Sequence, residues 1–393
     1  MHHSNIHQRL IRLYHKKNIK HGLFPLLIHR SALSLAHALF GIFIPIFLYQ
    51  ILNNSISLVL VFYLINNALF ALFIPWGAII MNKIGFKNSL LISTIFTAGI
   101  SIFLYFLSTT ENLYFLIPLQ LTWNVSRMFY WTAYHTEFAK FSDKKHRALE
   151  VSIFLGVIGF IQLVVPFFSG FFIDTHGFDL LYVIGTVIVF ISAIPLMFTQ
   201  DISETYEYGY FETFTQLMSK KWKKLFLPYA GEGAEFIIGS IVWPIFIFGL
   251  LNEKYTSVGI ISALVGLFTI MFRLYIGKLS DKLSKRTVLK YGNYLYAIFW
   301  IIKAFVETFF QIFIVNALHR IILVVRSTPF NALRYEQASN EQHYIDEYAV
   351  IREINVCIGR IIMILILLVF LQFAPVYLAF ILAAGLSLLI NLL

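Results

Sequence analysis

The decapeptide "GKLSDKLSKR" at residues 277–286 places five charged side chains between two long apolar stretches. The stretch before it reads "SALVGLFTIMFRLYI" (262–276), and the stretch after it reads "VLKYGNYLYAIFWII" (288–302). A helix needs roughly 20 mostly apolar residues to cross a lipid bilayer, and both flanks extend to about that length. The pattern predicts a short charged loop at a membrane surface between two membrane-spanning segments.

The composition of the whole chain supports a membrane protein. Of its 393 residues 59% are hydrophobic and only 13% are charged, whereas soluble domains have about 25% charged residues. The single cysteine, Cys357, excludes an internal disulfide. Residues 1–31 are basic and lack the apolar core of a signal peptide, so we expect a cytoplasmic arm there.

The apolar segments predict an all-α polytopic protein with twelve transmembrane helices. The strict alternation of an outer-membrane barrel is absent, which favours helices over strands. The predicted spans are 32–53, 57–80, 89–108, 113–135, 150–173, 178–199, 226–251, 257–277, 288–307, 309–330, 347–371 and 374–393.

Lysine and arginine are concentrated in every second connection of this map. They occur in the N-terminal arm, in the loops near residues 83–87, 140–147 and 278–290, and at 220–224 in the centre. By the positive-inside rule both termini are cytoplasmic, and we expect a multi-pass protein of the bacterial cytoplasmic (inner) membrane. The net charge of +10 then reflects topology and contact with lipid headgroups, not nucleic-acid binding.

The chain also contains a weak internal repeat. The polar connection 200–225 separates a first half, 32–199, from a second half, 226–393. A shift of 199 residues superimposes Asn82 on Asp281, Lys83 on Lys282, Lys87 on Arg286 and Glu137 on Glu336. Two pseudo-symmetric six-helix bundles with a solute site between them are a recurrent plan of secondary transporters.

The decapeptide resembles motif A of the major facilitator superfamily, G-x-L-x-D-[RK]-x-G-[RK]-[RK]. Ser284 stands where the family usually has glycine, and the residues that agree are Gly277, Leu279, Asp281, Lys282, Lys285 and Arg286. The first-half copy keeps Lys83, Gly85 and Lys87 but has Ala78 for Gly and Asn82 for Asp. This departure puts a first-half switch of motif A type in question.

The resemblance implies a gate at the cytoplasmic ends of the helices. There Gly277 permits close helix approach, Asp281 faces a helix N-terminus, and Lys282 and Arg286 pair with Glu336. Lys83, Gly85, Lys87 and Glu137 are the corresponding first-half residues. The alternative is that these charges only fix topology.

Two shorter stretches are similar to other family motifs. "RMFYWTA" (127–133) has Arg127 at the position of the motif B arginine. "GVIGFIQLVVPFFSG" (156–170) is similar to the antiporter motif C at Gly156, Pro166 and Gly170, but Val165 and Ser169 depart from it. The second similarity favours export, and an ordinary Pro/Gly-bent helix explains the same residues.

Polar residues inside the predicted spans are the candidates for binding a solute, because burying them in lipid is costly. The substrate-binding candidates are His37, Asn124, Arg127, Trp131, Asn316, His319 and Arg320. Arg127 and Arg320 come from opposite halves and suit an anionic solute, since a guanidinium binds carboxylate or phosphate in a fork. Arg326 and Lys303 are nearer span ends, where we expect their charges to reach the interface.

Glu232 and Glu235 are the candidates for proton coupling, because they lie about one turn apart in the same predicted span. Arg352 and Glu353 open span 11, and we expect them to be structural partners. Together these residues predict a proton-coupled secondary transporter that moves a small organic solute by alternating access.

Other classes of protein have less support in the sequence. No phosphate-binding G-x-x-x-x-G-K-[ST] loop, H-E-x-x-H motif or Cys/His cluster occurs. We therefore expect no enzyme activity, no cofactor and no metal, and a monomer whose partners are a small-molecule substrate, protons and membrane lipids. The alternatives are a multidrug or amphipathic-compound efflux antiporter, a lipid flippase on the same fold and, more distantly, a non-transporting membrane receptor.

Overall fold

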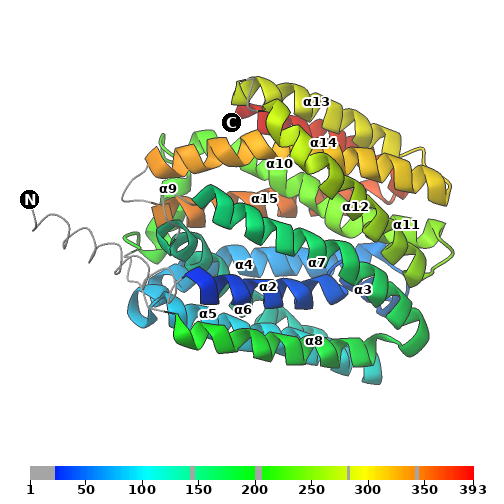
Figure 1. Cartoon of the computed structure of the whole chain (residues 1–393), viewed down its shortest axis with the longest axis horizontal. Helices are drawn as coiled ribbons and strands as arrows, with labels where there is room; N and C mark the ends of the chain where they lie inside the picture. Colours follow the sequence, from blue (N-terminus) through cyan, green and yellow to red (C-terminus); the bar gives the residue numbers. More distant parts are fainter. Residues whose placement is uncertain (1–22, 142–146, 200–205, 281–283, 341–344) are drawn as a thin grey trace, which may run out of the picture.

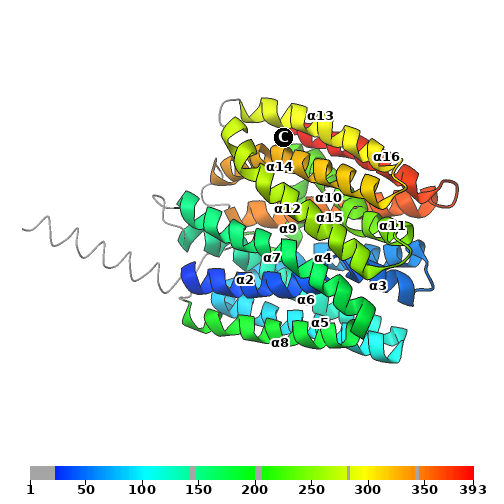
Figure 2. The ribbon, with the colours of Figure 1, turned by 45° about the vertical axis from the view of Figure 1, so that its right-hand side comes forward.

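The computed structural model describes residues 23–141, 147–199, 206–280, 284–340 and 345–393. Over these ranges the chain forms helices joined by short turns, with no β-strand. Figures 1 and 2 show that the long helices run roughly side by side along one direction. This is the arrangement that the hydropathy of the sequence predicts.

The first part of the chain consists of helices that coincide with the first six predicted spans. The apolar pair α2 and α3 is bent at residues 41–43, and the helix α8 ends in a 3-10 turn. Their bounds are α2 Leu23–Phe40, α3 Ile44–Ile51, α4 Ile56–Ile84, α5 Phe86–Thr110, α6 Leu116–Phe141, α7 Arg147–His176 and α8 Phe178–Ala193.

The second part follows a short helix in the central connection, α9 (Tyr210–Leu217). A π-helical turn at Ile238–Val242 joins α10 to α11, directly before Pro244. The remaining bounds are α10 Phe226–Ile237, α11 Trp243–Leu250, α12 Tyr255–Ser280, α13 Lys285–Lys303, α14 Phe309–Asn340, α15 Ile345–Phe370 and α16 Ala379–Ser387.

Nine helical segments of the described ranges are long and apolar enough to cross a membrane. These nine are α2 with α3, α4, α5, α7, α8, α10 with α11, α12, α14 and α15. The helices α6 and α13 coincide with two further predicted spans, and the segment Val376–Leu392, which contains α16, is apolar but shorter. Three predicted spans are thus helical but fall outside the nine.

Two helix pairs make the most extensive contacts between the first part of the chain and the second. The helix α7 packs along α12, and α4 packs along α15; Figures 1 and 2 both place α7 beside α12. At the α7–α12 contact Gly170 faces the carbonyl of Tyr255, and Gly259 faces the carbonyl of Pro166. Side chains at these glycines would collide with backbone, so small residues allow the close approach.

The two copies of the motif A loop begin their following helices in different ways. Gly85 precedes α5 with φ +81° and so uses the left-handed region that glycine favours. Ser284, at the equivalent position before α13, has φ −64° and its side chain accepts a hydrogen bond from the Thr287 N–H at 3.2 Å. Ser284 therefore replaces glycine as a helix N-cap.

Candidate functional site

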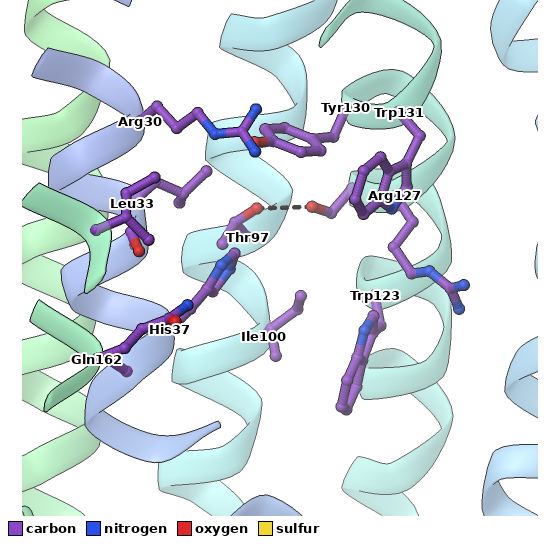
Figure 3. A pocket seen from close by; sticks show the side chains of 14 residues that line it. Arg30, Leu33, His37, Thr97, Ile100, Trp123, Arg127, Tyr130, Trp131 and Gln162 are labelled. Atoms are coloured by element: carbon purple, nitrogen blue, oxygen red, sulfur yellow. Dashed lines mark hydrogen bonds between the residues drawn. The ribbon is translucent and has the colours of Figure 1, made fainter. Parts of the chain in front are cut away.

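A cavity of about 340 Å³ lies among α2, α5, α6 and α7. His37, Arg127 and Trp131, three of the predicted solute-binding residues, line it. Arg30 and Gln162, which the sequence analysis did not single out, line it as well (Figure 3). The cavity thus contains two guanidinium groups and an imidazole, and no carboxylate is among its lining residues.

Aromatic rings and a hydroxyl pair form the wall of this cavity on α5 and α6. Trp123, Tyr130 and Trp131 line it, and the rings of Tyr130 and Trp131 meet edge to face at 5.4 Å. The hydroxyls of Thr97 and Ser126, which also line the cavity, are 2.6 Å apart and join α5 to α6 (Figure 3). An anionic group on an apolar or aromatic body would match this mixture of cations and rings.

Arg127 connects the cavity to α4. Its guanidinium points away from His37 in Figure 3. Its Nη1 donates to Asn66 Oδ1 at 2.8 Å, and its Cζ lies 3.8 Å from the centre of the Phe70 ring. The guanidinium is therefore held by a neutral amide and an aromatic face.

Arg360 of α15 is held in the same way by the next residue of α4. Its Nη1 donates to Asn67 Oδ1 at 3.2 Å, and its Cζ lies 4.4 Å from the centre of the Phe236 ring. Asn66 and Asn67 were not among the residues predicted from the sequence. Two adjacent asparagines within an apolar span are, like Arg127, polar residues in lipid, and this could have indicated them.

The other candidates of the first half and of α14 lie apart from this cavity lining. Asn124 is buried, and its Nδ2 donates to the Gln120 carbonyl at 2.8 Å, one turn back on α6. His319 is buried between Tyr296, with ring centres 4.2 Å apart, and Trp300. Asn316 is half-buried and Arg320 is exposed on α14. Arg320 is not among the residues that line the cavity with Arg127.

The expectation that Lys303 extends to the membrane interface is wrong. Lys303 is only 2% exposed, and its Nζ lies 4.2 Å from the Trp243 ring centre and 4.4 Å from that of Trp300. The two indole faces attract the ammonium group electrostatically. They stabilise the buried charge inside the second half.

The same expectation for Arg326 is also wrong, because Arg326 is paired with one of the predicted proton-coupling residues. It is 7% exposed, and its Nη2 lies 2.8 Å from Glu235 Oε2. Its Cζ lies 3.9 Å from the Tyr296 ring centre, and the Tyr296 hydroxyl donates to Glu235 Oε1. Glu235 and Arg326 therefore form a one-to-one ion pair in the interior of the second half.

Glu232, the other predicted proton-coupling residue, faces a different arginine. Arg352 Nη2 is 3.1 Å from Glu232 Oε2, and Arg352 Nη1 also pairs with Glu353. The expected partnership of Arg352 with Glu353 is confirmed. The Glu232 side chain is 26% exposed and that of Glu353 is 8% exposed, so two carboxylates share one guanidinium in a partly buried place.

The predicted gating residues are only partly described. Lys83 is exposed in the last turn of α4, Lys87 Nζ donates to the Met197 carbonyl at 2.8 Å, and Arg286 is exposed in the first turn of α13. Asp281 and Lys282 lie outside the described residues. Gly277, Glu137 and Glu336 belong to α12, α6 and α14, but their surroundings and side chains lie outside the described part.

Comparisons with known proteins agree with this architecture. A family model described as Major Facilitator Superfamily matches residues 26–249. A solved POT family transporter in complex with a thioalcohol-conjugated peptide is similar over 94% of both chains, with TM-score 0.72 and 11% identity. A POT family transporter in complex with 5-aminolevulinic acid is similar over 95% of this chain and 98% of that chain, with TM-score 0.71 and 12% identity.

A search of curated protein sequences finds no significant match. At these identities the two solved structures bear on the fold alone. The family model covers more than half of the 393 residues, and its match agrees with the apolar helices and with motif A. The chain is a multi-pass membrane protein that belongs to the major facilitator superfamily.

Proposed function

We propose that the chain is a secondary transporter that moves a small organic solute across a bacterial cytoplasmic membrane by alternating access. In this proposal twelve helices form two six-helix bundles, 32–199 and 226–393, connected by the loop 200–225. The arm 1–31 and both termini are cytoplasmic. The α7–α12 and α4–α15 contacts support a two-bundle arrangement because they are the main joints between the two parts of the chain.

The observation that carries the proposal is the polar cluster where these parts meet. Arg127 of α6 and Arg360 of α15 both bind α4, and Arg127 also borders the cavity that contains His37 and Trp131. Charged groups in a membrane interior mark solute pathways more often than structural sites. A solute bound there would contact helices of both bundles, as alternating access requires.

Proton coupling is the second part of the proposal. Glu232 and Glu353 share Arg352, and this group of three carries a net charge of −1 when both carboxylates are ionised. One bound proton would neutralise the group without leaving Arg352 alone. Glu235 has its own partner in Arg326 and is the weaker candidate.

The gate of motif A type remains part of the proposal. In it Gly277, Asp281, Lys282 and Arg286 act with Glu336, and the first-half residues Lys83, Gly85, Lys87 and Glu137 provide a reduced counterpart. The exposed position of Lys83 and the bond from Lys87 to Met197 are compatible with this role.

The experiment is reconstitution of the purified protein in liposomes with an imposed pH gradient. The solutes tested are small carboxylates, including 5-aminolevulinic acid and dipeptides, because similar folds bind such molecules. We expect at least one of them to be accumulated against its gradient and to carry protons with it. Absence of solute-dependent flux in both directions across the panel would contradict the proposal.

A drug or amphipathic-compound efflux antiporter is the second candidate. The observation that favours it is the close contact of Pro166 and Gly170 of α7, both motif C residues, with α12. Transport limited to amphipathic cations in the same liposomes would favour this candidate over the first. Scrambling of labelled lipid alone would favour a flippase.

A further inference from the structure

Two adjacent asparagines of α4 hold two arginines that come from different parts of the chain. Asn66 and Asn67 are 2% and 3% exposed. Their amide nitrogens are already engaged, since Asn66 Nδ2 donates to Gln120 Oε1 at 2.9 Å and Asn67 Nδ2 donates to the Tyr63 carbonyl at 2.7 Å. These two bonds orient the Oδ1 atoms of Asn66 and Asn67 toward the arginines.

Neither guanidinium has a carboxylate partner among the described residues. Arg326 and Arg352 are in ion pairs within the second half, whereas Arg127 and Arg360 bond to asparagine oxygens and face aromatic rings. Arg127 also bonds to the buried Cys357, whose thiol is neutral. Within the described residues the Nε of Arg360 has no hydrogen-bond partner. Glu353, whose charge acts on Arg127, is itself bound to Arg352.

Burying two guanidinium charges without counter-charges costs free energy, and a bound anion would offset that cost by neutralising them. A guanidinium presents parallel N–H groups that match the two oxygens of a carboxylate or phosphate. The donors not used on Asn66, Asn67 and Cys357 remain available for such a group.

We propose that Arg127 and Arg360 form the binding site for the anionic group of the solute, a carboxylate or a phosphate. This inference rests on the proposed transport function and names the substrate class of its site. The aromatic cavity beside Arg127 takes the rest of the molecule. Because the site joins α4 and α6 to α15, an anion bound there holds the two parts of the chain together.

The test uses simple anions and needs no knowledge of the solute. Thermal unfolding of the purified protein is followed against acetate and inorganic phosphate at constant ionic strength, and ligand binding to the folded state raises the unfolding temperature in a saturable way. Comparing the acetate titration with the phosphate titration distinguishes a carboxylate site from a phosphate site. The variants are Arg127→Gln, Arg360→Gln and Arg360→Lys, with Lys254→Gln, which removes an exposed positive charge just before α12, as the control.

We expect saturable stabilisation by one of the anions, with affinity about tenfold weaker in Arg127→Gln and Arg360→Gln and an intermediate loss in Arg360→Lys, which keeps the charge but not the fork. Lys254→Gln should bind like the wild type. No saturable effect of either anion, or an equal loss in Lys254→Gln, overturns the site. Transport in liposomes that is unchanged in Arg360→Gln overturns the site but not the transport function.

A second, independent observation concerns the central connection, which is bonded to both parts of the chain. Asn82, at the end of α4, accepts from the Tyr206 N–H and donates to the Tyr206 carbonyl, each at 2.8 Å. The Glu207 N–H donates to Glu347 Oε1 of α15 at 2.7 Å. Tyr206 is 3% exposed, and its hydroxyl bonds to Thr213 of α9 at 2.7 Å.

The amide of Asn82 explains why this position is not aspartate, as motif A would have it. An ionised carboxylate could accept from the Tyr206 N–H but would repel the Tyr206 carbonyl, whereas an amide satisfies both groups. We infer that residues 206–217 are a strap that ties α4 to α15 and must release before these helix ends can separate.

Hydrogen exchange tests the strap directly, because the amides of Tyr206 and Glu207 are its two attachment points. Asn82→Asp should speed exchange at Tyr206 about tenfold or more, since repulsion between the carboxylate and the Tyr206 carbonyl lowers the free-energy cost of local opening there. Asn88→Asp is the control: Asn88 is exposed on α5 and donates only to the Ile84 carbonyl of the preceding turn.

Spin labels at residue 88 of α5 and residue 290 of α13, in a Cys357→Ala background, report separation of the first and second parts of the chain. We expect Asn82→Asp to shift the distance distribution toward longer values. Wild-type exchange at Tyr206 as fast as in an unstructured peptide, or an unchanged distance distribution in Asn82→Asp, overturns the strap.

Discussion

The arginines in two polar regions of the protein have different kinds of partner. In the interior of the second half Arg326 is bound to Glu235, and Arg352 is bound to Glu232 and Glu353. Where α4, α6 and α15 meet, Arg127 and Arg360 are bound to asparagines. The first region carries its own counter-charges and is complete without a ligand, whereas the second keeps a positive charge that a solute anion can neutralise.

The largest effect that tests this comparison is on stability. Glu235→Gln leaves Arg326 buried without a counter-charge, and breaking a buried pair in this way costs about 3–5 kcal/mol. We expect a strong drop in unfolding temperature in detergent. Glu232→Gln is the matched change, and it should cost less because Glu232 is 26% exposed and Arg352 keeps Glu353. Equal losses in the two variants would remove the distinction between the pairs.

A substitution that gives Arg127 a carboxylate partner, like the partners of Arg326 and Arg352, tests the comparison further. Asn66→Asp supplies Arg127 with a carboxylate at the position of the present 2.8 Å bond and removes the amide that donates to Gln120, whose own amide nitrogen is bonded to the Phe62 carbonyl. The internal carboxylate then competes with the solute anion, and we expect about tenfold weaker binding of acetate or phosphate, worth about 1.4 kcal/mol. Unchanged affinity in the thermal assay, with Asn88→Asp as control, would contradict the anion site.

Glu232 should contribute to proton coupling more than Glu235 does. Glu232→Gln removes one of the two carboxylates that share Arg352, so we expect loss of pH-driven accumulation with solute exchange retained. The measurement compares uphill uptake and exchange in the same liposomes. Glu307→Gln, an exposed change outside these pairs, is the control. Full uphill transport in the Glu232 variant would exclude this residue as the coupling site.

The smallest expected effects concern the two motif A loops. Ser284→Ala removes the N-cap of α13 and should lower stability by about 1 kcal/mol. Gly85→Ala forces a Cβ into the left-handed region at φ +81° and should cost about 1–2 kcal/mol. Thermal unfolding of the two single variants checks both values. A neutral Ser284→Ala would mean that the cap contributes nothing to the helix.

Hydropathy and loop charges were sufficient to predict the helical architecture. The length of an apolar segment and the scarcity of charged residues within it are properties of consecutive residues, so they can be read from the sequence. The family was predicted from motif A together with the twelve-span pattern and the internal repeat, all of which are visible along the chain. The cavity residues His37, Arg127 and Trp131 were found because polar side chains in apolar spans are conspicuous.

Pairing partners were not predictable in this way. Arg326 and Glu235 are 91 residues apart, and only helix packing brings them together. Arg326 and Lys303 were expected at the interface because of their positions near span ends, but a carboxylate in one case and two indole rings in the other stabilise them inside. Asn66 and Asn67 were missed because their span, 57–80, contains no charged residue, whereas Asn124 and Asn316 each lie within four residues of an arginine.

The central claim is that the two asparagine-bound arginines bind the solute, and paired uptake measurements test it most directly. Liposomes containing wild type, Arg360→Gln or the control Lys254→Gln are given an inward proton gradient and a panel of labelled small carboxylates and organic phosphates. We predict accumulation of an anionic solute by wild type and Lys254→Gln, and its loss in Arg360→Gln. Accumulation of that solute by Arg360→Gln at the wild-type level would contradict the claim.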